Sequence, residues 1–279
     1  MIFNNKQKLK LNTKKLNQFI LTSLIFFISL ATYGKNIISL TPHITEILFA
    51  IGAGNKIIAI DNYSDYPDAT KNIIKIGDFH NLDLEKIISL KPDLIIAWQS
   101  SNKKQVTQLQ KLGFKVFLSN AKTFNDVAYE IKELGKLTNN IKNAEKVANG
   151  FLTKINNLKN KYKHKQKVSV FYQIWHKPLM TIGSKQIINQ AINICGANNI
   201  FTALAKVTYQ IDVELILAKN PDVIIMNESQ LKHSFWHKFS DFNKKIITVS
   251  DSLLARMGPR LQDGVKELCE KLDYVRKQI

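Results

Sequence analysis

Arginine is scarce in this chain of 279 residues, in which only three of the 40 basic residues are arginine. All three lie near the C-terminus, as Arg256, Arg260 and Arg276, while the lysines are spread along the whole sequence. Proteins that read bases or clamp phosphates favour clustered arginine, because its planar guanidinium makes paired hydrogen bonds. A nucleic-acid partner is therefore not expected, in spite of a formal net charge of +18.

Common catalytic motifs are absent as well. The sequence has no Gly-x-Ser-x-Gly, no Walker loop, no His-Glu-x-x-His and no Cys-x-x-Cys. The six histidines do not form a metal-ligand motif, although His43, His80 and His176 could converge from three loops. We expect a binding protein that is not an enzyme and holds no metal or prosthetic group. A haem or iron-siderophore carrier and an exported metal-dependent enzyme are the alternatives.

Cysteine is limited to Cys195 and Cys269. In an exported protein a single pair is more often a disulfide than a catalytic thiol or a metal site. Two buried free thiols are the alternative at this stage.

The N-terminus has no acidic residue before position 35, five lysines, and an apolar run from Phe19 to Ala31. This run is short for a membrane span, so residues 1–34 are predicted to be a signal peptide, cleaved near residues 31–34, and the mature protein is expected to be exported. An uncleaved anchor is the alternative. Loss of the five lysines lowers the formal net charge from +18 to +13.

Two segments repeat each other. Residues 82–96 and 211–225 are identical at seven of fifteen positions, and half of the other positions are apolar in both. Each segment is typical of an Asp-capped helix, a Pro-Asp stop and a short buried strand. The repeat predicts two similar α/β lobes, with a ligand cleft between them.

The hydrophobic pattern outside the repeat alternates short strands with amphipathic helices, which favours Rossmann-like lobes with mainly parallel sheets. From Ile141 to Tyr162 apolar residues recur every three or four positions without a proline, which predicts one long helix. We therefore expect an N-terminal lobe over residues 35–138, a backbone helix linker over residues 139–166, and a C-terminal lobe over residues 167–279. The further expected strands are residues 37–40, 56–60, 115–118, 168–173 and 245–249, and the further expected helices are residues 44–53, 105–112, 187–195 and 259–272.

Aromatic residues follow several of the predicted strands, namely Tyr63, Phe79, Trp98 and Trp175. In open α/β sheets ligands bind beyond the carboxyl ends of the strands. A wall of aromatic side chains suits a large, flat, partly apolar ligand better than a sugar phosphate or a bare ion.

Four stretches carry a family resemblance: Ser39-Leu40-Thr41-Pro42-His43-Ile44-Thr45-Glu46, Tyr63-Ser64-Asp65-Tyr66-Pro67, residues 84–98, and Cys195-Gly196-Ala197-Asn198-Asn199-Ile200-Phe201. With them the chain resembles the periplasmic substrate-binding proteins of ABC importers whose lobes are joined by one backbone helix, and among these the cobalamin-binding branch. The likeness runs from about Ile37 to the last helix. It implies a monomeric carrier that captures cobalamin, a corrinoid, and delivers it to a permease in the inner membrane.

The resemblance also implies roles for individual residues. Cys195 and Cys269 match a disulfide pair of that branch. Glu85 and Glu214 match acidic residues that dock on the permease, although a carboxylate in the first turn of a helix is also favoured by the helix dipole alone. The implied ligand-binding residues are Tyr63, Phe79, Trp98, Ile174, Trp175, Tyr209, Asp251 and Arg256.

The chain departs from that branch at several of these positions. Phe79 stands where tryptophan is usual, Ile174 replaces an aromatic residue, and Thr208 replaces a tryptophan beside Tyr209. The acid expected before Arg256 is Ala255. The part of the pocket contributed by the second lobe is thus altered.

Overall fold

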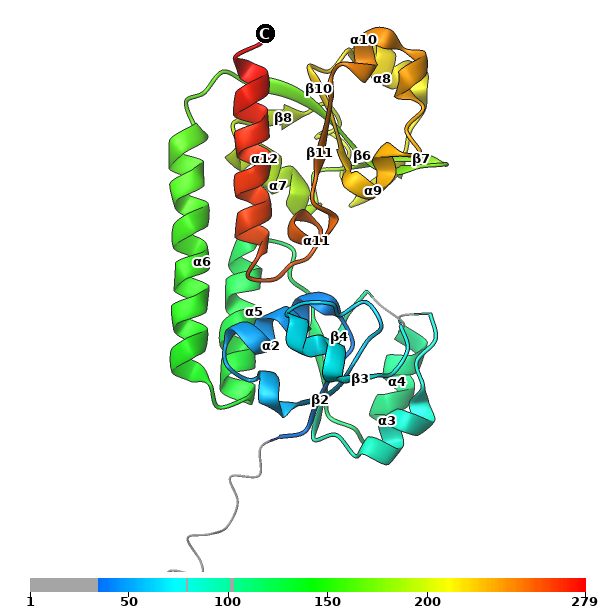
Figure 1. Ribbon diagram of the computed structural model, residues 1–279, viewed down its shortest axis with the longest axis vertical. Coiled ribbons are helices and arrows are strands. Elements are labelled where there is room, and N and C mark those ends of the chain that lie inside the picture. Colours follow the sequence, from blue (N-terminus) through cyan, green and yellow to red (C-terminus); the bar gives the residue numbers. More distant parts are fainter. Residues whose placement is uncertain (1–34, 79, 101–102) are drawn as a thin grey trace, which may run out of the picture. The chain divides into compact units, whose positions relative to one another are not determined.

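The computed structural model describes residues 35–78, 80–100 and 103–279. The predicted signal peptide and Phe79 therefore lie outside the described residues. Within residues 35–279 the chain forms two β-sheets with helices around them (Figure 1).

The first sheet is parallel throughout and has the strand order β3-β2-β1-β4-β5. Its strands are β1 Ile37–Ser39, β2 Ile57–Ile60, β3 Ile74–Lys75, β4 Leu94–Trp98 and β5 Val116–Ser119. The α-helices between and after them are α2 Pro42–Ala50, α3 Leu84–Leu90, α4 Lys103–Lys111 and α5 Phe124–Leu137. Helices between parallel strands cover the sheet faces, which explains why the strands are short apolar runs rather than alternating ones.

The second sheet has the strand order β11-β10-β6-β7-β9, with β8 also paired to β6. Its strands are β6 Val168–His176, β7 Leu179–Ile182, β8 Ala197–Asn199, β9 Thr208–Gln210, β10 Val223–Asn227 and β11 Ile246–Val249. Strands β10, β11, β6 and β8 run parallel, whereas β7 is antiparallel to both β6 and β9. The helices of this half are α7 Ile187–Ile194, α8 Val213–Lys219, α9 Glu228–Leu231, α10 Ser240–Asn243, α11 Asp251–Leu254 and α12 Leu261–Arg276.

The two copies of the sequence repeat end their helices in the same way but begin them differently. The predicted Asp cap forms only in the first copy, where Asp83 accepts from the Lys86 N–H, whereas Asp212 makes no side-chain capping hydrogen bond. Helices α3 and α8 each end at a residue in the left-handed conformation, Lys91 with φ 47° and Asn220 with φ 40°. The aspartate of each Pro-Asp pair then accepts a hydrogen bond of 2.7 Å from a backbone N–H at the start of a neighbouring strand: Asp93 from Asn36, and Asp222 from Ser169. The repeated aspartate therefore holds the start of the neighbouring strand, just after the helix has ended at Lys91 or Asn220.

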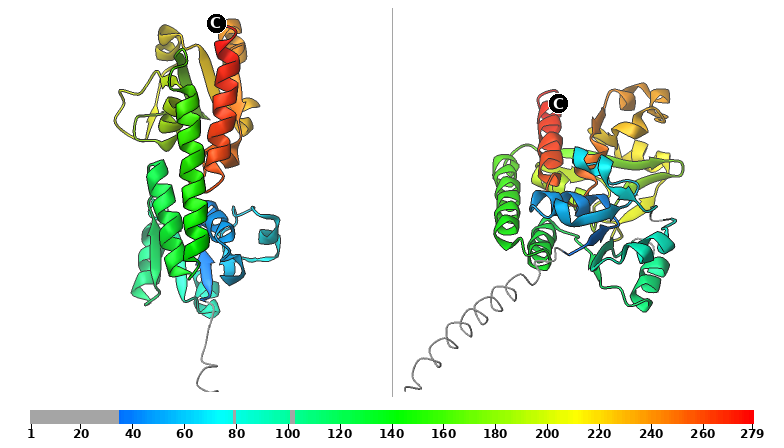
Figure 2. Two further views of the ribbon diagram at one scale, coloured as in Figure 1. Left: turned by 90° about the vertical axis from the view of Figure 1, so that its left-hand side faces the viewer. Right: turned by 60° about the horizontal axis from the view of Figure 1, so that its bottom comes forward.

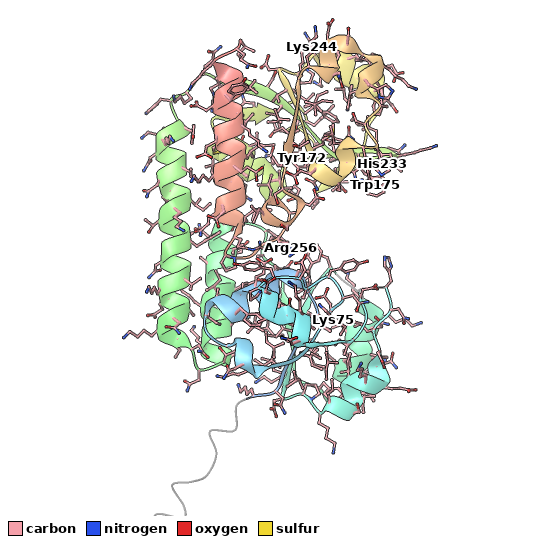
Figure 3. The ribbon with its side chains drawn as sticks, in the orientation of Figure 1. Lys75, Tyr172, Trp175, His233, Lys244 and Arg256 are labelled. Atoms are coloured by element: carbon pink, nitrogen blue, oxygen red, sulfur yellow. A yellow bond between two sulfur atoms is a disulfide. The ribbon has the colours of Figure 1, made fainter. Side chains whose placement is uncertain are left out.

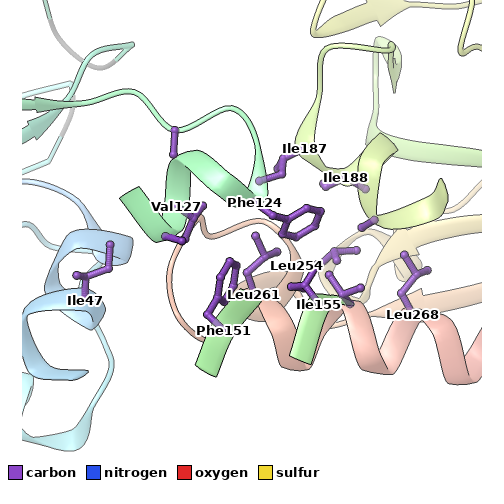
Figure 4. Close-up of a cluster of buried hydrophobic side chains, with 14 of the residues drawn as sticks. Ile47, Phe124, Val127, Phe151, Ile155, Ile187, Ile188, Leu254, Leu261 and Leu268 are labelled. Carbon is purple, nitrogen blue, oxygen red and sulfur yellow. The ribbon is translucent and has the colours of Figure 1, made fainter. Parts of the chain in front are cut away.

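The helix α6 spans Ile141–Tyr162, as the spacing of apolar residues predicts. It packs along α5 and also contacts α7 and α12 (Figure 2). Buried side chains of these helices form one continuous hydrophobic cluster that includes residues of both sheets. Figure 4 shows part of it, with Phe124 and Val127 of α5, Phe151 and Ile155 of α6, Ile187 and Ile188 of α7, and Leu261 and Leu268 of α12. A shared core of this kind disfavours free movement of one half against the other.

Cys195 and Cys269 form a disulfide, and both residues are fully buried. The bond joins the end of α7 to α12, so the predicted pairing is confirmed. Within the described part of the chain, no helix combines the length and the apolar character that a membrane crossing requires.

Several elements differ from the sequence-based expectation, and β7, β8, β9, α9, α10 and α11 were not predicted. Strand β6 continues through Trp175 to His176 and pairs with β7 as a hairpin, so the predicted strand at residues 168–173 was too short. Helix α5 was not predicted, although Thr123 and Asp126 form a reciprocal capping box at its start.

Candidate functional site

A cavity of about 420 Å³ lies at the carboxyl ends of the central strands of the first sheet. Strand β1 has β2 and β4 as its neighbours, so the loops that follow these three strands meet at one edge. The chain passes from one side of β1 to the other here, which is the switch point where open α/β sheets bind ligands. The residues that line the cavity are Leu40, Thr41, Pro42, Asp61, Tyr63, Trp98, Ser100 and Arg256.

Tyr63 is held at the cavity by the loop after β2. The Asp61 carboxylate is buried and accepts hydrogen bonds from the Tyr63 backbone N–H at 3.1 Å and from the Ser64 hydroxyl. Burial raises the pKa of Asp61, an effect opposed by these hydrogen bonds. Lys75 stabilises this loop, because its ammonium donates hydrogen bonds to the backbone carbonyls of Asp61 and Ser64. The Tyr63 side chain itself is 52 % exposed, so this loop presents an aromatic ring to solvent.

Trp98 is the last residue of β4, and its side chain is partly buried. Its ring lies edge-on to the His43 ring, with the two centroids 6.2 Å apart. His43 is 5 % exposed and lies in the first turn of α2. Burial, with a contribution from Arg256, lowers the pKa of His43 to about 4, so the imidazole is neutral at neutral pH.

A chain of buried side chains runs from the cavity to α5. His43 Nδ1 lies 2.9 Å from Thr41 Oγ1, and His43 Nε2 lies 3.0 Å from Ser119 Oγ. Ser119 donates to Glu130 Oε2 at 2.7 Å, and Glu130 Oε1 accepts from the Asn120 backbone N–H. Burial raises the pKa of Glu130, opposed by these hydrogen bonds. Both nitrogens of His43 are thus engaged within the protein.

Arg256 is the cavity residue that comes from the second half of the chain (Figure 3). Its guanidinium donates to Glu46 at 3.1 Å and to Asp65 at 2.5 Å. Glu46 is almost fully buried and also accepts two hydrogen bonds from Arg260. The acid that the family resemblance led us to expect before Arg256 is replaced by Ala255. Glu46 and Asp65, both from the first half of the chain, pair with Arg256.

The loop between α11 and α12 approaches α2 closely. A Cβ at Gly258 would lie 3.3 Å from the His43 carbonyl oxygen, a tighter contact than most Cβ atoms make, so the loop packs closely on α2. The Arg260 guanidinium lies 3.7 Å from the centre of the Tyr66 ring, in a cation-π contact. The loop that carries Arg256 is therefore fixed by backbone packing, a cation-π contact and ion pairs.

The β6–β7 hairpin carries a second aromatic group. Trp175 is 46 % exposed and its ring lies 5.1 Å from that of His176. The His176 ring stacks on His233 at 4.7 Å, and His176 Nδ1 lies 3.0 Å from Gln230 Oε1. Figure 3 labels Trp175 and His233 in the second half, and the His176 ring contacts both of them. This row of rings is an aromatic surface in which Trp175 and His233 are exposed and His176 is half-buried.

The remaining predicted site residues of the second half have different surroundings. Ile174 packs against the hydrophobic core. The Tyr209 hydroxyl accepts a hydrogen bond of 2.7 Å from the Lys206 backbone N–H. Asp251 begins α11, and its buried Oδ1 has no hydrogen-bond partner among the described residues. Its charge adds to burial in raising the pKa of Tyr172.

The cavity therefore brings together Tyr63, Trp98 and Arg256 of the predicted ligand-binding residues. Ile174, Trp175, Tyr209 and Asp251 do not line it. Thr41 and Asp61 do line it, and neither is among the predicted ligand-binding residues. Thr41 lies within one of the stretches that carry the family resemblance, and Asp61 directly follows a predicted strand. Both residues could therefore have been predicted as site residues from the sequence.

Glu85 and Glu214 occupy equivalent places outside the cavity. Each is exposed and lies in the first turn of its helix, α3 or α8. The preceding Asp83 caps α3 through its side chain, which accepts from the Lys86 N–H at 2.9 Å. Glu85 is therefore not needed as the cap of that helix.

Comparison with known proteins agrees with this geometry. Residues 37–249 match the periplasmic binding protein family. A vitamin B12-binding protein of Vibrio parahaemolyticus is 30 % identical over 273 residues, which cover 94 % of this chain and 99 % of that protein.

Solved structures show the same fold. The crystal structure of the periplasmic vitamin B12-binding protein BtuF of Vibrio cholerae has a TM-score of 0.79 at 31 % identity, over 88 % of this chain and 99 % of that one. A periplasmic haem-binding protein of Roseiflexus, RhuT, has a TM-score of 0.78 at 21 % identity, over 87 % and 99 % of the two chains, and shares the fold alone. From the matched family and the relatives that span nearly its whole described length, this chain belongs to the periplasmic binding protein family.

Proposed function

We propose that this protein captures cobalamin and delivers it to the permease of an ABC importer. The observation that carries the proposal is the cavity at the switch point of the first sheet, where Tyr63 and Trp98 supply aromatic surface. Its volume of about 420 Å³ suits part of a corrinoid rather than the whole molecule, so the ligand extends beyond it. The BtuF structure and the vitamin B12-binding relative support the choice of ligand.

The chemistry of this wall suits a corrin better than a small polar solute. Aromatic rings gain free energy from burying flat apolar surface, and their edges and faces also bind polarised groups. Around the rings lie hydroxyl and carboxylate groups of Thr41, Asp61 and Ser100. Trp175 is the candidate contact from the second half, because its ring is exposed on the hairpin.

The proposal includes export, a monomeric carrier and no enzymatic activity. The basic N-terminal segment followed by a short apolar run supports a cleaved signal peptide. The buried disulfide fits an oxidising compartment. The proposed division is a lobe over residues 35–138, a linker over residues 139–166 built on α6, and a lobe over residues 167–279. The shared core around α6 supports small movements between the lobes, so that docking on the permease drives release.

Calorimetry with cyanocobalamin tests the proposed function. We expect the purified exported protein to bind one equivalent with a dissociation constant below about 1 µM, equivalent to about −8 kcal/mol or better. The absorption spectrum of protein recovered from the titration should be that of a corrinoid. A titration without heat at tens of micromolar protein would contradict the proposal.

Trp98→Ala should weaken cyanocobalamin binding about 30-fold, since loss of a central aromatic contact typically costs about 2 kcal/mol. Trp98→Phe retains an aromatic face and should lose less than about fivefold. Tyr129→Ala removes an exposed ring on α5 and serves as the matched control, with unchanged affinity. Equal binding by Trp98→Ala and the unaltered protein would remove Trp98 from the site.

A haem or iron-siderophore ligand is the second candidate, because His176 and His233 stack beside Trp175. His43 does not support it, since both of its nitrogens are hydrogen-bonded within the protein. A Soret band in the purified protein, or tighter binding of haemin than of cyanocobalamin, would favour haem.

A further inference from the structure

Four buried side chains, Thr41, His43, Ser119 and Glu130, connect the cavity wall to α5 through three hydrogen bonds. Each of these residues is at most 6 % exposed. Thr41 lies at the N-cap of α2, yet its side chain makes no capping hydrogen bond. Its hydroxyl is directed to His43 instead. A capping hydrogen bond usually stabilises a helix by about 1 kcal/mol, and the Thr41 hydroxyl makes the hydrogen bond to His43 in place of it.

The position of each proton in this hydrogen-bonded series can be worked out from Glu130, the residue farthest from the cavity. Glu130 accepts from the Asn120 backbone N–H and from the Ser119 hydroxyl, so the single proton of Ser119 points to Glu130. Ser119 Oγ must then accept from His43, which places the imidazole proton on Nε2. The neutral ring has its lone pair on Nδ1, and Nδ1 accepts from Thr41.

Thr41 is therefore left with acceptor capacity only. Its one proton is used by His43, whereas its oxygen has lone pairs to spare and no donor among the described residues. Because Thr41 lines the cavity, a ligand that satisfies this oxygen must bring an N–H or O–H donor.

The charges around the cavity do not favour an anion either. Arg256 is the cation of the lining, and its guanidinium is already paired with Glu46 and Asp65. The pKa of Asp65 is lowered chiefly by its hydrogen bond to Arg256, which shows how closely the two are paired. Asp61 adds a carboxylate to the lining. A ligand carboxylate would therefore face the Thr41 oxygen, which can only accept a hydrogen bond, and the Asp61 carboxylate, which would repel it.

We propose that Thr41 is a specificity residue that accepts a hydrogen bond from a side-chain carboxamide of the corrinoid, so that the cavity selects amides over carboxylates. His43, Ser119 and Glu130 are the positioning residues that set the direction of the Thr41 proton. The proposal rests on cobalamin being the ligand and goes further, since it names the chemical group that this wall recognises. Corrinoids carry carboxamides at their edge, whereas haem carries propionates.

The test compares cyanocobalamin with its monocarboxylate derivatives, in each of which one side-chain amide has been hydrolysed. Protein purified from the periplasmic fraction is titrated with each compound. We expect at least one derivative to bind about tenfold more weakly than cyanocobalamin. Thr41→Val, which removes the hydroxyl at nearly constant shape, should reduce that discrimination below about threefold. Thr41→Ser keeps the hydroxyl and should keep the discrimination.

The outcomes separate this inference from the proposed function. Failure of the unaltered protein to bind cyanocobalamin overturns both. Binding of cyanocobalamin and of every monocarboxylate with equal affinity overturns the amide preference alone, as does full discrimination by Thr41→Val.

Nitrogen-15 NMR of the histidine rings gives a readout independent of any ligand. We expect His43 to be protonated at Nε2 and unprotonated at Nδ1, and to remain neutral from pH 8 down to about pH 5, in keeping with its pKa of about 4. Thr41→Val should shift the Nδ1 resonance while leaving the protonated nitrogen unchanged. A His43 protonated at Nδ1 would reverse the hydrogen bond and overturn the inference.

Discussion

The double variant Cys195→Ala/Cys269→Ala is expected to lose about 4 kcal/mol of unfolding free energy. The disulfide joins residues that are 74 positions apart, and in the chain-entropy account a loop of this length restricts the unfolded chain by about that amount. The bond is fully buried between α7 and α12, beside the core that both halves share. Its loss should therefore destabilise residues 35–279 as a whole.

Urea unfolding and thermal unfolding, each followed by circular dichroism, measure the free energy and the melting temperature. A loss of about 4 kcal/mol corresponds to a decrease of the melting temperature by about 10 °C for a chain of this size. The unaltered protein with reductant should shift in the same direction, which separates loss of the cross-link from loss of the sulfur atoms. A double variant within about 1 kcal/mol of the unaltered protein would contradict the expectation.

The sequence predicted the fold where local signals and packing agree. The periodic apolar residues of α6 and the repeated aspartates were sufficient. Apolar residues that fill the buried face of a helix also decide its place in the core, and each repeated aspartate binds the start of a neighbouring strand. Helix α5 was missed although it has a capping box, and β6 was ended too early. The extension of β6 depends on its pairing with β7, a contact that local propensity does not contain.

The site was less accessible to sequence reasoning, because its electrostatics depend on residues far apart. Arg256 was predicted at the site, but its partners Glu46 and Asp65 lie 210 and 191 positions away in the sequence. The buried chain from Thr41 to Glu130 likewise joins β5, α2 and α5. Patterns of single residues show which positions are unusual, and only the tertiary structure shows which of them are hydrogen-bonded to one another.

The charge reversal Glu85→Lys/Glu214→Lys is expected to abolish delivery of cobalamin while leaving its binding intact. This prediction depends on the proposed function and on the proposed docking role of the two glutamates. Both are exposed and equivalent in the two halves, and neither lines the cavity. Pairs of opposite charge across an interface set its specificity and speed of association, and reversal of two of them should reduce uptake by more than about tenfold.

The helix dipole offers a purely structural reason for the same two residues. On that account reversal would cost about 0.3–1 kcal/mol of stability at each helix and leave uptake unchanged in a folded protein. The matched control is Asp68→Lys/Glu145→Lys, which changes the net charge equally at two other exposed acids. Calorimetry, thermal unfolding and cellular uptake of labelled cyanocobalamin are measured on both variants. Loss of uptake in the Glu85/Glu214 variant alone, with unchanged affinity, is the result expected of docking; equal uptake by the two variants would leave the glutamates as helix-terminal residues only.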